Sequence, residues 1–151
     1  MINRLTEAIS MALREEFGSG CKIHREEKRQ ELEEPCFFIF CISPESRRYF
    51  GKRYFRKAQF CLHYFPQDRL HANEECHAAA ERLFACLEYL AVDGDPVMGT
   101  GMHYEVDDGI LHFFVNYDMF VYRAEAPAPE MEEMKIKGLS ERRRDGKEKG
   151  L

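Results

Sequence analysis

The strongest constraint on the fold is a pair of long β-type segments joined by a tight-turn sequence. Residues 98–106 and 110–122 flank Asp107-Asp108-Gly109, and an Asp-Gly step supplies the positive φ angle that a short hairpin turn requires. In the second segment the apolar residues fall on one face: Leu111, Phe113, Val115, Tyr117, Met119 and Val121. His112, Asn116 and Asp118 share the other face. We therefore expect an antiparallel hairpin with one side in the core and the other side wet or in an interface.

Three further strands are expected before this hairpin. Residues 36–42 form a continuous apolar run between Pro35 and Pro44, which is typical of a strand covered on both faces. Residues 54–65 alternate instead, so this strand places two sets of side chains on opposite faces. The sets are Phe60, Leu62 and Tyr64, and Lys57, Gln59, Cys61 and His63. Residues 21–25 predict a short first strand.

Two amphipathic helices are also expected. Ile2, Leu5, Ile9, Leu13 and Phe17 recur at three- and four-residue steps, a spacing that predicts a helix of about four turns. The second helix is predicted to begin after Asn73 as N-cap, with acidic residues in its first turn, and to end at residues 93–96. Its apolar stripe comprises Cys76, Ala79, Ala80, Leu83, Leu87 and Leu90.

The element order predicts one α+β domain over residues 1–122. The order is α-β-β-β-α-β-β, with two helices packed on a mostly antiparallel or mixed sheet. From residue 123 the composition changes, with Ala-Pro-Ala-Pro at 126–129 and then a charged segment that includes Arg142-Arg143-Arg144. Residues 123–151 are therefore predicted to be a linker and a charged, flexible C-terminal tail.

Composition narrows the class of protein. The net charge of −5 argues against general nucleic-acid binding, although basic and acidic residues are segregated along the chain. The N-terminal segment lacks the apolar stretch of a signal peptide, and no uncharged run approaches the roughly 18 residues of a membrane span. We expect a soluble protein of the cytoplasm whose six cysteines are free thiols.

Three segments carry a resemblance to a known family. They are residues 34–39 (Glu-Pro-Cys-Phe-Phe-Ile), 51–54 (Gly-Lys-Arg-Tyr) and 60–66 (Phe-Cys-Leu-His-Tyr-Phe-Pro). Together they resemble the tail terminator proteins of phages and prophages of Gram-positive-type hosts, and the expected order of elements over residues 1–122 agrees.

The resemblance implies a structural role. Such proteins close the head-proximal end of the polymerised tail tube, commonly as a six-membered ring, and offer a surface to head-completion proteins. The implied partners are copies of the chain, the tail-tube protein and a head-completion protein, with no membrane. The implied location is the host cytoplasm during assembly, then the virion or a tail-like particle.

One segment stands out as a candidate binding site. Residues 47–57 contain no acidic residue and are predicted to form a basic, aromatic loop whose candidate site residues are Arg47, Arg48, Tyr49, Lys52, Arg53, Arg56 and Lys57. Three interpretations stay open: a protein interface, an exposed hairpin loop anchored by its aromatic rings, and non-specific DNA contact through phosphates and stacked bases. A small nucleic-acid-binding module is therefore the alternative to the assembly function.

Neither a cofactor nor a catalytic site is predicted. No serine lies in a nucleophile-elbow pattern, and Gly99-Thr100-Gly101 lacks the rest of a phosphate-binding loop and is better explained as a bulged strand start. No Cys-x-x-Cys pair is present. A zinc site of Cys61, His63 and His112 is a third hypothesis, consistent with a metal- or thiol-dependent regulatory domain. A buried cysteine acting as a small apolar residue is the preferred interpretation.

Overall fold

Nine helices and strands make up the part of the chain that the structure, a computed structural model, describes: residues 1–26 and 33–122. The helices are α1 (Ile2–Phe17) and α2 (Ala72–Cys86). The strands are β1 (Lys22–His24), β2 (Cys36–Cys41), β3 (Glu45–Phe50), β4 (Arg53–Phe65), β5 (Tyr89–Val92), β6 (Asp95–Asp107) and β7 (Ile110–Tyr122). Met1–Val121 form one compact unit. The predicted tail at 123–151 lies outside the described residues, and the domain boundary at 122 stays a prediction.

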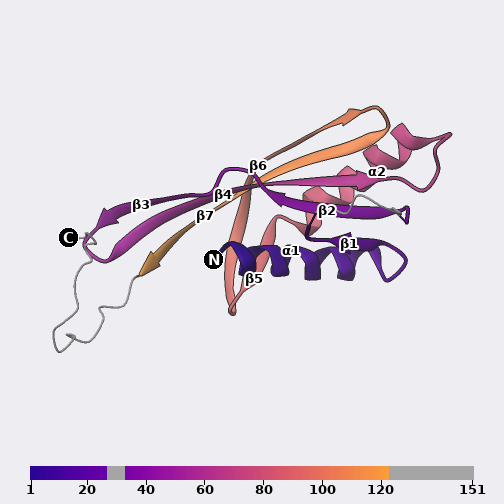
Figure 1. The fold of residues 1–151 in the computed structure, drawn as a ribbon. Helices are drawn as coiled ribbons and strands as arrows, with labels where there is room; N and C mark the ends of the chain where they lie inside the picture. Colours follow the sequence, from indigo (N-terminus) through magenta and orange to yellow (C-terminus); the bar gives the residue numbers. More distant parts are fainter. Residues whose placement is uncertain (27–32, 123–151) are drawn as a thin grey trace. The chain divides into compact units, whose positions relative to one another are not determined.

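The strands form a mixed seven-stranded sheet (Figure 1). Its order is β1-β2-β4-β7-β6-β5, and β3 pairs with β4. β1 pairs with β2 in parallel, while the β2–β4, β3–β4, β5–β6 and β6–β7 pairs are antiparallel. The predicted α+β class and element order are confirmed, and the structure adds two strands to that order, β3 and β5.

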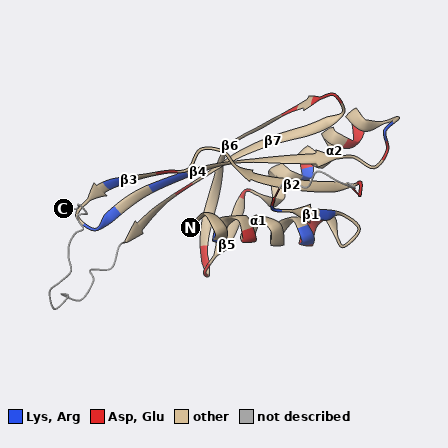
Figure 2. Ribbon diagram, viewed as in Figure 1, with Lys and Arg blue, Asp and Glu red and all other residues tan. Residues whose placement is uncertain are grey.

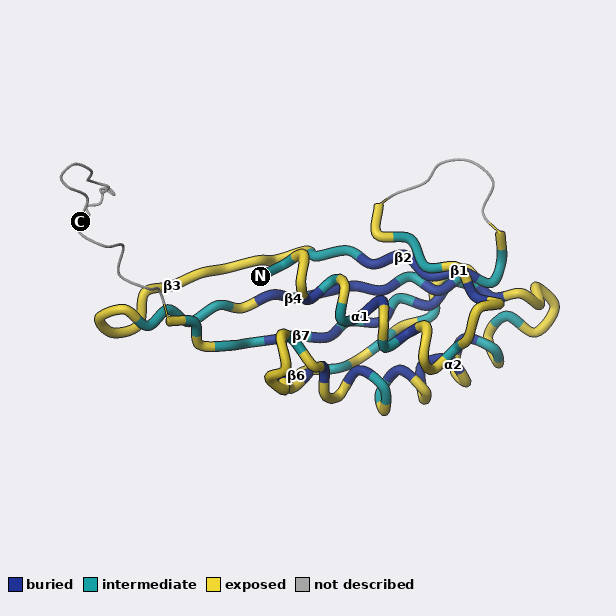
Figure 3. The backbone as a smooth tube through the Cα atoms, turned by 90° about the horizontal axis from the view of Figure 1, so that it is seen from below, coloured by how far each residue is buried: buried dark blue, intermediate teal, exposed yellow. Residues whose placement is uncertain are grey.

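Both helices pack on one face of this sheet, where they form the core (Figure 3). α1 contributes Leu5, Ile9 and Leu13, all fully buried. The facing strand residues are Phe37, Ile39, Phe60, Leu62, Tyr64, Leu111, Phe113, Val115 and Tyr117. Burial of each large apolar side chain contributes about 1.5–3 kcal/mol. The predicted assignment of alternate residues of β4 and β7 to the core face is therefore confirmed. Neither described helix is long and apolar enough to span a membrane.

The turn between β6 and β7 has the predicted chemistry. Asp108 and Gly109 both adopt positive φ angles, 56° and 75°, as a tight hairpin turn requires. The register of β6 against β7 shifts between Thr100 and His103, and Gly101 has a φ of 59°. The bulge expected at residues 99–101 is therefore present, but it lies inside β6 because this strand already begins at Asp95.

The second helix is shorter than predicted. It begins at Ala72 with His71 as N-cap and ends at Cys86, whereas the sequence predicted an Asn73 cap and an end at residues 93–96. Leu87 is the C-cap, and Leu90 lies on β5. Both leucines are buried in the core. Their three-residue spacing continues the apolar stripe of the helix in the sequence, although the helix ends before Leu87 and a strand begins before Leu90.

The sheet face opposite the helices, here called the open face, carries the other residues of the central strands. It includes Phe38, Phe40, Cys61, His63 and His112, which alternate with the core residues along β2, β4 and β7. Their rings contact one another: the Phe38 and Phe40 centroids lie 6.2 Å apart and those of Phe40 and His63 lie 5.0 Å apart. The open face is thus rich in aromatic and imidazole groups.

Candidate functional site

The predicted basic loop is a β-hairpin. β3 pairs antiparallel with the first residues of β4, with Arg47 opposite Phe55 and Arg48 opposite Tyr54. Gly51 in the turn has a φ of 60°, which favours glycine, and Arg48 Nε donates a hydrogen bond to the Gly51 carbonyl oxygen at 3.0 Å. Residues 47–50 are therefore part of a strand where the sequence predicted a loop, while the chain from residue 54 onward is a strand as predicted. The sequence did not reveal β3 because all of its residues are exposed and no alternation of burial marks it as a strand.

This basic hairpin, residues 45–57, concentrates positive charge at one place in the compact unit. It contains six Lys and Arg residues against Glu45 alone, and Figure 2 shows the blue residues gathered on β3 and the paired part of β4. The hairpin extends past the N-terminal end of α1 in both views (Figures 1 and 3). None of its residues belongs to the buried core.

All the sequence-predicted site residues lie on this hairpin. Arg47, Arg48, Tyr49, Lys52 and Lys57 are exposed, whereas Arg53 and Arg56 are half-buried. The side chain of Tyr49 is 63% exposed and that of Phe50 is 77% exposed. Large rings in water at this level are typical of a surface that a partner covers.

Aromatic rings hold two of the arginines on the hairpin. The Arg53 guanidinium lies 4.8 Å from the centroid of Phe120 and 5.6 Å from that of Tyr49. Arg47 lies 5.9 Å from the centroid of Phe55. Such cation–π contacts contribute about 0.5–1 kcal/mol each at exposed sites, so they orient the two guanidinium groups on the hairpin.

Phe120 is the member of this site that sequence reasoning missed. It lies on β7, 63 residues or more from the hairpin in sequence, yet its ring centroid is 5.2 Å from that of Tyr49 and 5.1 Å from that of Phe55. The sequence did contain a signal for this contact. Phe120 lies two residues after Asp118 on β7, and therefore on the same face as Asn116 and Asp118, which was expected to be wet. An apolar ring at such a position indicates a contact across strands or with a partner.

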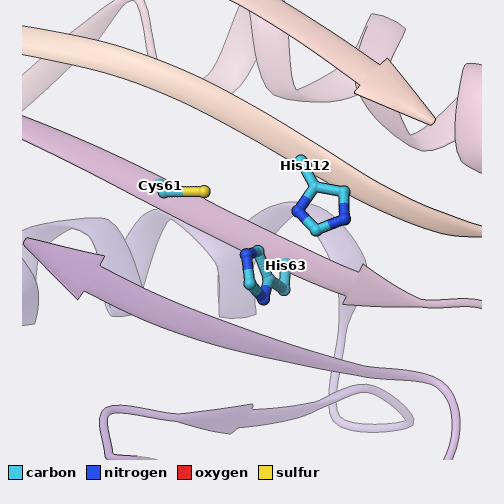
Figure 4. A group of neighbouring side chains, drawn as sticks. All are labelled: Cys61, His63 and His112. Atoms are coloured by element: carbon cyan, nitrogen blue, oxygen red, sulfur yellow. The ribbon is translucent and has the colours of Figure 1, made fainter. Parts of the chain in front are cut away.

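A second group of side chains lies on the open face, and it could hold a metal ion (Figure 4). Cys61 and His63 come from β4 and His112 from β7, and one ligand atom from each lies within 4.8 Å of the others. Burial raises the pKa of Cys61 to about 11, with a further contribution from the charge of Glu105. Burial, together with His112, lowers the pKa of His63.

The chain is similar to a known protein family. The family model described as phage tail terminator protein matches residues 4–129, which is most of the chain and includes the basic hairpin, α2 and α1 from its third residue. No curated protein matches the chain. The family match agrees with the resemblance of residues 34–66. The chain therefore belongs to the phage tail terminator family, whose role lies in the assembly of phage tails.

Proposed function

We propose that this protein caps the head-proximal end of a phage or phage-like tail tube as a ring and presents the basic hairpin to a neighbouring protein. The family match over residues 4–129 carries the proposal. Closure of a tube by a terminator needs shape and contact surfaces and no bond-breaking chemistry. The function is accordingly structural, exercised first during assembly in the host cytoplasm and then in the finished particle.

The surface chemistry of the hairpin supports a protein partner. Exposed Tyr and Phe rings beside arginines match the composition of interface centres, where aromatic residues and arginine are enriched. Tyr49, Arg53 and Phe120 already contact one another, so little side-chain freedom is lost when a partner covers them. A head-completion protein or a second subunit is the partner we propose.

Charge segregation supports a ring. Away from the basic hairpin, Figure 2 shows acidic residues around the β6–β7 turn and on α2. Asp107, Asp108 and Glu74 are exposed there, and Glu74 and Asp108 line one shallow cleft together with Arg69 and His71. Two different surfaces of opposite charge favour a head-to-tail contact between copies. Head-to-tail contacts generate a closed ring when the rotation per subunit divides a full turn.

Charge reversal at the hairpin tests the proposal. The variant carrying Arg47→Glu and Arg48→Glu is expected to lose ring formation or head joining while it keeps its circular-dichroism spectrum and melting temperature, because both residues are exposed. The matched control carries Arg14→Glu and Arg25→Glu, the same charge change at exposed positions outside the hairpin. Light scattering and electron microscopy report the ring, and complementation of a terminator-deficient phage reports tail length and head joining.

Two outcomes would contradict the proposal at different levels. If the hairpin variant supports normal rings, tail length and head joining, the hairpin is not the contact surface. If particles that lack the protein altogether still have tails of uniform length joined to heads, the capping function is wrong.

DNA contact by the same hairpin is the second candidate, favoured by its six basic residues and its exposed rings. Each phosphate neutralised adds about 0.9 to the slope of log affinity against log salt. Steeply salt-dependent binding of DNA that the Arg47→Glu and Arg48→Glu variant loses would support this function. Absence of binding at low salt would remove it and leave the protein interface intact.

A further inference from the structure

We propose that Cys61, His63 and His112 bind one Zn²⁺ ion on the open face of the sheet. The site lies on β4 and β7, apart from the basic hairpin, and the proposal does not depend on the capping function. The three side chains converge from two neighbouring strands, as Figure 4 shows.

The strand geometry brings the three ligands together. Cys61 and His63 are two residues apart on β4, so their side chains point to the same face, and His112 lies on β7, the neighbour of β4 in the sheet. The ring centroids of the two histidines are 4.4 Å apart with an interplanar angle of 74°. Crossed rings of this kind can both direct a nitrogen toward one point between them.

The distances suit zinc after a small movement of the side chains. The three ligand atoms lie within 4.8 Å of one another. Tetrahedral zinc with N and S ligands needs separations of about 3.3–3.6 Å, from bonds of about 2.0–2.3 Å. Each ligand atom therefore moves by about 1 Å or less, a displacement that small χ rotations provide without a change in the strands.

The donor set favours zinc over the hard cations. One thiolate and two imidazoles suit Zn²⁺, whereas Mg²⁺ and Ca²⁺ prefer oxygen ligands. Three protein ligands leave the fourth tetrahedral position for a water molecule. On metal binding, the Cys61 thiol releases its proton to solvent and the thiolate sulfur coordinates the metal ion.

The surroundings provide charge and shielding. Glu105 lies directly opposite His112 in the β6–β7 register, so its carboxylate is on the same face and, with the Cys61 thiolate, balances the two positive charges of the ion. Phe40 lies opposite Cys61 on β2, with its ring 5.0 Å from that of His63. This ring covers one side of the site and strengthens the electrostatic attraction by excluding water.

A purely apolar role explains Cys61 but not its two neighbours. Cys61 is 5% exposed and could fill space as a small hydrophobic residue. His63 and His112 are only half-buried, and their nitrogens are not among the buried side-chain atoms without a hydrogen-bond partner in the described part of the chain. Their nitrogens offer coordination positions to a metal ion, which a purely space-filling role does not require.

Metal analysis of the full chain, purified without a histidine tag and without added metal, tests the site. We expect about one zinc per chain by mass spectrometry of the metal. After removal of zinc, Co²⁺ should produce a thiolate charge-transfer absorption and the intense visible bands of a tetrahedral site. Zinc at a hundred times its dissociation constant should raise the ratio of folded to unfolded protein about hundredfold.

Variants assign the ligands. Cys61→Ala, His63→Gln and His112→Gln should each reduce bound zinc at least tenfold. Cys36→Ala and His103→Gln change a cysteine and a histidine elsewhere on the sheet and should retain it. If the ligand variants keep their zinc, or if the wild-type chain binds neither zinc nor cobalt, the proposal is refuted. Binding of copper alone would overturn the assignment to zinc.

A measurement on the unaltered chain keeps the test decisive where a variant fails to fold. Zn²⁺ should slow the alkylation of Cys61 by iodoacetamide at least tenfold, as mapped by mass spectrometry, and should leave the relative rates at the five other cysteines unchanged. Equal alkylation of Cys61 with and without zinc would refute the site.

Discussion

Replacement of Glu75 by Gln should destabilise the fold through the connection between β4 and α2. The Glu75 carboxylate accepts three hydrogen bonds: from the Tyr64 hydroxyl at 2.7 Å, from the Gln67 amide at 2.8 Å and from the Asp68 amide at 3.0 Å. One side chain in the first turn of α2 therefore holds the end of β4 and the segment that follows it.

The size of the effect follows from the number of donors. Hydrogen bonds to a charged group contribute about 1.5–3 kcal/mol when buried, and partial exposure of Glu75 lowers this to about 1 kcal/mol each. Glutamine keeps one carbonyl oxygen but turns an NH₂ group toward a donor, so Glu75→Gln should lose about 2 kcal/mol. For a chain of this size that corresponds to a fall of about 6 °C in melting temperature.

The same contact predicts a pH dependence. Burial alone would raise the pKa of Glu75, but the hydrogen bonds from Tyr64, Asp68 and Gln67 outweigh it and hold that pKa below its ordinary value of 4.5. A lowered folded-state pKa gives stability that is present above the unfolded pKa and is lost as the pH falls through the folded pKa. The difference between wild type and Glu75→Gln should therefore shrink below about pH 4.

Urea denaturation followed by circular dichroism, at neutral pH and in acid, measures both effects. Glu74→Gln is the matched control, because Glu74 is an exposed neighbour in the same helical turn and shares the helix-dipole contribution. Tyr64→Phe completes a double-mutant cycle, whose coupling should be about 1 kcal/mol. A Glu75→Gln variant no less stable than Glu74→Gln, or a loss that stays constant with pH, would refute the reasoning.

Three further predictions concern the core and the site. Tyr117→Phe removes the hydroxyl that donates to the buried Leu87 carbonyl at 2.6 Å and should lower the free energy of unfolding by about 1–3 kcal/mol; a change in urea midpoint near zero would contradict this. Gly99→Ala places a Cβ atom 2.6 Å from the same carbonyl and should cost about 1–3 kcal/mol, whereas Gly20→Ala, in open space, should be nearly neutral in the same thermal melts. Phe120→Ala should fold normally and weaken ring formation by light scattering, since it removes the ring that contacts Tyr49 and Arg53; unchanged rings would exclude Phe120 from the interface.

Local patterns predicted most of the fold because they report burial directly. The alternation in β4 and β7 identified the core face, and Asp108-Gly109 identified the turn. The end of α2 was not predictable from spacing, because Leu87 and Leu90 continue the helical stripe and reach the same core from a C-cap and a strand.

The candidate sites were less accessible from the sequence. The sequence does not predict β3, because a strand exposed on both faces has no period-two pattern of burial. Phe120 was missed since its contacts with the hairpin depend on which strands pair. His112 was named with Cys61 and His63, but only the adjacency of β4 and β7 shows that the three groups meet.

The hairpin at 45–57 contributes no residue to the buried core. Selection for a stable fold therefore acts on the described core strands, whereas selection for partner binding acts on this hairpin. Substitutions there leave the buried packing untouched, so a lineage can exchange charges and rings to follow a changing partner without weakening the fold. Substitutions in β2 or in the second half of β4 have no such freedom. Related proteins should accordingly differ more at the exposed residues of β3 than in β2 and the second half of β4.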